Sequence, residues 1–123
     1  MHPDVQRIRG MSVKELVERV GPICEHLSAE GWQAMLEKVW LEGTQEDTTQ
    51  FLANQFNYAK QRCEESPTGE YTMFGGETSD SIVTASNNAC KTINEAWKQR
   101  GGKAYPSAHR VSKKSMTTTL RPA

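Results

Sequence analysis

The chain has 123 residues and a mass of 13.8 kDa, which is enough for one domain with one hydrophobic core. Hydrophobic residues make up only 36% of it, so the core is expected to be modest. The first fifteen residues contain no apolar stretch typical of a signal peptide. Apolar runs such as residues 39–41 are far shorter than the roughly 20 residues that span a bilayer. We therefore expect a cytoplasmic protein that makes no membrane contact.

The net charge of zero conceals a separation of signs along the chain. Residues 1–97 contain all fifteen acidic residues and eight Lys and Arg, a balance of −7. Residues 98–123 contain the other seven basic residues and no acid, a balance of +7. Such a separation indicates a basic tail with an acidic partner. The residues that we predict to bind this partner are Lys98, Arg100, Lys103, Arg110, Lys113, Lys114 and Arg121.

A first helix is predicted after Ser12, which is a suitable N-cap. We expect it to end at Gly21 and Pro22, because glycine suits the position after a helix and proline suits the first turn of the next one. A short segment containing Leu27 follows. The apolar face of the first helix would be formed by Leu16, Val17 and Val20.

The clearest helix is predicted from about Ala29 to Glu42, with Ser28 as its N-cap and Gly43 just after its end. Its apolar side chains recur with the period of a helix, so they should form a single buried stripe. For the two tryptophans and the methionine of this stripe we consider two roles, core packing and a dimer interface. The stripe comprises Trp32, Met35, Leu36, Val39 and Trp40.

Two further helices are predicted, over residues 47–65 and from residues 78–80 to just before Gly101. Asp47 followed by Gln50 resembles a capping box at the start of the earlier one. Helical spacing predicts which side chains of the two helices face inward. For the earlier helix these are Leu52, Phe56, Ala59 and Cys63, and for the later one Ile82, Ala85, Ala89, Ile93 and Trp97.

Residues 70–74 lie between glycines and have β propensity, so we expect at most one short β element, and it would lie here as a strand or hairpin arm. Beyond Gly102 the chain is rich in Ser and Thr, and its apolar residues are scattered, with no run longer than two. The sequence therefore predicts a mainly α fold of four to five helices, with a helical domain over residues 1–102 and an extended basic C-terminal tail over residues 103–123.

Catalytic and metal chemistry have weak support in the sequence. Nucleophilic catalysis needs a Cys or Ser beside an oriented His, but Cys24 and His26 would point to nearly opposite faces of a helix. With Cys63 and Cys90 these residues are too widely spaced for a compact zinc site. We expect three buried structural cysteines and predict no catalytic residue, metal or cofactor. The Gly75–Gly76 pair lacks the rest of a phosphate-binding motif and is interpreted as a loop.

Residues 13–30 partly resemble a helix-turn-helix, with Gly21 near the position of the turn glycine. The second helix would carry Glu25 and Glu30 and no basic residue, which is unfavourable for a helix that reads DNA. A plain helical hairpin is the favoured interpretation.

These observations favour a non-enzymatic interaction protein, acting as an adaptor, assembly factor or inhibitor, whose basic tail contacts an acidic surface. The partner would be another protein or a further subunit, because short chains with few apolar residues often complete their core in a homo-oligomer. A DNA-binding regulator that uses residues 13–30, the basic tail or both is the alternative. A short helical body with a charged tail is also the style of small phage and plasmid accessory proteins.

Overall fold

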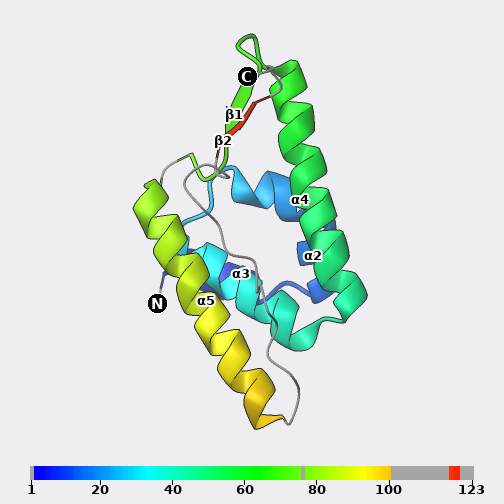
Figure 1. Cartoon of the computed structure of the whole chain (residues 1–123), viewed down its shortest axis with the longest axis vertical. Coiled ribbons are helices and arrows are strands. Elements are labelled where there is room, and N and C mark those ends of the chain that lie inside the picture. The colour runs from blue at the N-terminus through cyan, green and yellow to red at the C-terminus, as the bar shows by residue number, and fades with distance from the viewer. Residues whose placement is uncertain (1, 76, 101–116, 120–123) are drawn as a thin grey trace.

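The computed structural model in Figure 1 describes residues 2–75, 77–100 and 117–119, with side chains for the first two ranges. The described chain is mainly helical, which confirms the predicted fold class. In chain order its elements are α1 (Pro3–Arg9), α2 (Val13–Cys24), α3 (Ala29–Glu42), α4 (Gln45–Glu65), β1 (Glu70–Thr72), α5 (Ser79–Gln99) and β2 (Thr117–Thr119).

Two helix pairs make up the body: α3 packs against α5, and α2 packs against α4 (Figure 1). The core between them is centred on Trp32, which is fully buried. Its indole Nε1 donates a hydrogen bond to the Ser86 hydroxyl of α5 at 2.8 Å. The rings of Phe74 and Phe51 lie 5.0 and 6.0 Å from it, centroid to centroid. One aromatic side chain of α3 thus contacts three other parts of the fold.

Three of the predicted helix starts are confirmed by their caps. The hydroxyl groups of Ser12, Ser28 and Thr78 each accept a hydrogen bond from a backbone N–H in the first turn of α2, α3 and α5. The predicted start of α4 is wrong by two residues. Thr44 is its N-cap, and Asp47 is the third residue of the helix, where its carboxylate accepts the Thr44 N–H at 2.8 Å.

The predicted helix end at Gly21 and Pro22 is wrong, because α2 continues through both residues to Cys24. Gly21 is buried against Tyr58 of α4, and a Cβ atom on Gly21 would overlap the Cγ and Cβ atoms of that side chain. Glycine is therefore needed here for close helix packing rather than to end a helix. Pro22 is exposed and costs the helix one backbone hydrogen bond.

The inward face predicted for α4 is only partly correct. Ala59 and Cys63 are buried, as expected. Leu52 and Phe56, in contrast, are 36% and 62% exposed. The buried positions of the first half of α4 are occupied instead by Thr48, Phe51 and Gln55.

The stripes predicted for α3 and α5 are confirmed, with Trp97 half-buried and the other predicted positions buried. Helix α1 and strand β2 were not anticipated from the sequence. Helix α1 begins with Pro3 at its first position and buries Ile8 against the core. The short β element at residues 70–74 is β1, which pairs antiparallel with β2, so that Tyr71 lies opposite Thr118. The remainder of the predicted tail lies outside the described residues.

We predict that Gly21→Ala destabilises the protein by about 1–3 kcal/mol, because the added methyl group forces α2 and α4 apart. Urea unfolding followed by circular dichroism measures this change in the free energy of unfolding. Gly10→Ala is the matched control, since its Cβ would meet only backbone oxygens at 3.5 and 3.6 Å. Equal midpoints for the two variants would show that the α2–α4 contact is not tight.

Candidate functional site

The residues considered for a dimer interface lie in the interior of the chain. Trp32 and Met35 are 0% exposed and Trp40 is 3% exposed. The Trp40 ring meets that of Phe51 edge-on, with centroids 5.4 Å apart. These three residues therefore pack in the core, and in this fold they present no surface to a partner.

Two of the predicted tail residues are placed by the structure. Lys98 and Arg100 are exposed at the end of α5, and the Arg100 guanidinium donates a hydrogen bond to the carbonyl oxygen of Leu41 at 3.0 Å. That carbonyl is in the last turn of α3, where a cation is favourable. The other predicted residues, Lys103, Arg110, Lys113, Lys114 and Arg121, lie outside the described residues.

The three cysteines are buried, as predicted. Burial raises the pKa of the Cys24 thiol well above its ordinary value, so it stays protonated at neutral pH. His26 is exposed. In residues 2–75 and 77–100 there is no group of three His, Cys, Asp or Glu side chains that could hold a metal ion.

Within these described residues, no helix has both the length and the apolar character needed to cross a bilayer.

The turn of the helix-turn-helix resemblance in residues 13–30 does not fall where the sequence places it. The first helix does not stop at Gly21, and only the start of α3 falls within this stretch.

The loop predicted at Gly75 is confirmed, and its backbone is hydrogen-bonded to the end of α2. The N–H groups of Phe74 and Gly75 donate to the carbonyl oxygens of Cys24 and Glu25 at 3.1 and 3.0 Å. These N–H groups therefore satisfy the end of α2 rather than an anion.

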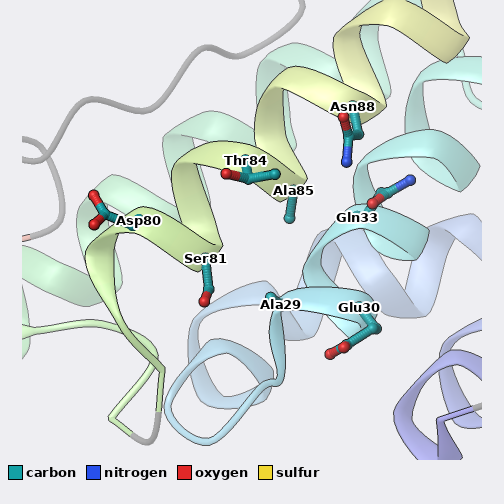
Figure 2. A pocket seen from close by; sticks show the side chains of 8 residues that line it. All are labelled: Ala29, Glu30, Gln33, Asp80, Ser81, Thr84, Ala85 and Asn88. Atoms are coloured by element: carbon teal, nitrogen blue, oxygen red, sulfur yellow. The ribbon is translucent and has the colours of Figure 1, made fainter.

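A polar groove of about 390 Å³ lies between the first halves of α3 and α5 (Figure 2). Gln33 and Asn88 point toward one another across the gap, whereas the carboxylates of Glu30 and Asp80 point away from it (Figure 2). Both carboxylates are in the first turn of their helices, a position that the helix dipole favours. The groove is therefore lined by amides, hydroxyls and small side chains together with Glu30 and Asp80, whose carboxylates do not converge.

A second cluster of polar side chains joins α2, α4 and β1. The Nε atom of Arg62 lies 3.0 Å from the Glu25 carboxylate, and its guanidinium lies 5.8 Å from the centre of the Tyr71 ring. Tyr58, one turn before Arg62 on α4, meets Tyr71 edge-on at 6.2 Å. No local sequence pattern indicates this cluster, because its members come from three separate elements.

The chemistry of this cluster favours a structural role. Burial, followed by the charge of Glu25, raises the pKa of Tyr71 far above its ordinary value of 10.0. Burial and a hydrogen bond with Glu25 also raise the pKa of Tyr58. Both phenols thus remain protonated at neutral pH and cannot act as bases. The Glu25–Arg62 pair is partly exposed, so it contributes at most about 1 kcal/mol to stability.

The outward side of α4 is the third notable surface. Leu52 and Phe56 are one turn apart and are the exposed large hydrophobic side chains of residues 2–75 and 77–100. A single exposed apolar side chain is ordinary, but an adjacent pair on one helix face indicates a contact surface. This surface was missed at the sequence level because the apolar spacing of α4 is equally compatible with a buried stripe.

Comparison of the chain with protein-family models, curated protein sequences and solved structures finds no match.

We predict that Tyr71→Phe leaves the free energy of unfolding at pH 7 unchanged within about 0.5 kcal/mol or raises it. The reason is that the buried Tyr71 hydroxyl has no hydrogen-bond partner among the described residues. Urea unfolding at pH 7 and pH 11 is the measurement.

The same pair of experiments tests the raised pKa of Tyr71. In the unfolded chain this phenol ionises above about pH 10, whereas in the folded chain it stays neutral, so its contribution to stability is lost as the pH rises through that range. The phenylalanine variant should therefore lose less stability between pH 7 and pH 11 than the wild type. An equal loss in both proteins would contradict the burial of this hydroxyl.

Proposed function

We propose that this chain is a non-enzymatic interaction protein, an adaptor, assembly factor or inhibitor, that acts by binding a macromolecular partner. The observation that carries the proposal is the charge separation, −7 over residues 1–97 and +7 over residues 98–123. A basic segment whose apolar residues are scattered gains more from contact with an acidic surface than from forming a core of its own. The partner is another protein or a further subunit of this chain.

The described residues support this proposal in two ways. Lys98 is exposed at the end of α5, where the basic segment begins, so the segment starts at the surface of the helical body. The polar clusters of the body are also engaged in holding its elements together, as Glu25 and Arg62 do between α2 and α4. The surfaces that remain for function are those of a binding protein.

Duplex DNA is a second candidate for the basic segment, because residues 98–123 contain seven positive charges and no acid. Binding would be electrostatic and would not depend on residues 13–30. With seven charges available, the logarithm of the affinity should fall against the logarithm of the salt concentration with a slope of about −6 at most.

The experiment compares full-length chains that differ only in tail charge. Lys103, Arg110, Lys113, Lys114 and Arg121 are replaced together by Gln, which retains the β1–β2 pairing at residues 117–119 that a truncation would remove. We expect this variant to lose at least about tenfold in partner binding at low salt, because its charge contacts are removed. The measurement is recovery from a native-cell lysate, with and without nuclease.

A variant with Lys103, Lys113 and Lys114 changed to Arg is the control, since it keeps every charge. It should recover the same partner as the wild type. Recovery that disappears after nuclease treatment would favour the DNA candidate. Recovery of the partner by the Gln variant at wild-type levels would overturn the role proposed for the tail.

A further inference from the structure

We propose that the outer face of α4 is a self-association surface, on which a second copy of this chain packs its own α4 antiparallel about a two-fold axis near Ala53. The inference rests on the proposed function in one respect: it takes a further subunit of this chain as the partner. The outer face of α4 is defined by the exposed residues Glu46, Thr49, Leu52, Ala53, Phe56 and Lys60.

The first argument is an inverted pattern of burial along α4. Thr48 and Gln55 are 5% and 7% exposed, whereas Leu52 and Phe56 are 36% and 62% exposed. The Gln55 amide donates a hydrogen bond to the Met73 sulfur, a weak acceptor, at 3.4 Å. A helix that buries polar side chains and exposes a Leu–Phe pair gains free energy when a further surface covers that pair.

Rotation of α4 cannot relieve this pattern within the single chain. The Tyr58 ring is held against Gly21, where α2 leaves no room for a Cβ atom. On the same side of α4, the Asn54 amide donates a hydrogen bond to the carbonyl oxygen of Val17 at 2.8 Å. Any rotation that turned Phe56 inward would break both contacts. The outer face of α4 is therefore presented in a fixed orientation.

A second copy is the occupant because the outer face of α4 is complementary to itself. In an antiparallel pair centred on Ala53, Glu46 lies seven residues before the axis and Lys60 seven residues after it. Each is therefore about 10.5 Å from the axis along the helix. Glu46 of one copy is then level with Lys60 of the other, and two such pairs form by symmetry.

The apolar residues of the outer face match in the same arrangement. Leu52 and Phe56 lie close to the axis, so the two side chains of one copy meet those of the other. Ala53 at the centre lets the helices approach closely. The interface would thus have a small apolar centre and a charged rim, which is the usual organisation of protein–protein contacts.

Sedimentation velocity on the full-length chain at several concentrations is the test. We expect a concentration-dependent dimer for the wild type, and a dissociation constant at least about tenfold higher for Phe56→Glu, because the pairing would place charges at its apolar centre. Thr92→Glu is the matched control, since Thr92 is an exposed helical position on α5, outside the proposed surface. It should dimerise like the wild type.

Charge reversal distinguishes the antiparallel register from other contacts. Glu46→Lys and Lys60→Glu should each raise the dissociation constant about tenfold, because each turns both rim attractions into repulsions. The double variant Glu46→Lys/Lys60→Glu should return to within about threefold of the wild type, since the pairs are restored with their signs exchanged. Both positions are exposed, and equal melting temperatures would confirm that the variants fold.

A wild-type chain that stays monomeric at several hundred micromolar, or a double variant no better than either single one, would overturn the proposed dimer. A monomeric chain that still recovers a different protein through its basic segment would overturn this inference alone and leave the proposed function standing. If the chain dimerises through the outer face of α4 and the Gln variant recovers its partner at wild-type levels, the role proposed for the tail is overturned and the dimer inference stands.

Discussion

The contact between Gly21 of α2 and the Tyr58 ring of α4 fixes how α4 is rotated about its own axis, and the rest of the helical body follows from that rotation. Because Tyr58 faces α2, Arg62 one turn later comes within 3.0 Å of Glu25 at the end of α2. The same rotation turns Phe51 toward the tryptophans of α3 and leaves Leu52 and Phe56 outside. One glycine thus determines both a polar cluster and an exposed apolar pair.

The core on the other side of α4 sets the aromatic side chains Trp32, Trp40, Phe51 and Phe74 among aliphatic ones. Trp32 reaches Ser86 of α5 through its indole N–H, and Phe74 packs on it from the loop after β1. Phe74 adopts a positive φ of 58°, a conformation that is uncommon for a bulky residue and that surrounding contacts must stabilise. Its backbone hydrogen bond to Cys24 and its fully buried ring provide those contacts. A chain with few apolar residues can close its core in this way because each aromatic ring covers a large area.

The polar groups inside the body are mostly held in their uncharged forms. Cys24 and Tyr71 are buried in surroundings that keep them protonated, and the groove between α3 and α5 gathers amides and hydroxyls without a converging charge. The distinctive chemistry is instead at the surface, in the outer face of α4 and in the separation of charge between the body and residues 98–123. The two features lie in different parts of the chain, one on α4 and the other in the segment that follows α5.

The sequence by itself determined the helical class, the caps at Ser12, Ser28 and Thr78, and the buried stripes of α3 and α5, because these depend on local hydrogen bonding and on helical periodicity. It also determined the charge separation. Tertiary structure decided the role of Gly21, since the same residue type ends helices and permits close packing, and only the position of Tyr58 distinguishes the two. It also decided which side of α4 is buried. Leu52 and Phe56 have the spacing of a core stripe, but the contacts of Tyr58 and Asn54 with α2 orient them outward, and no local pattern in α4 contains that information.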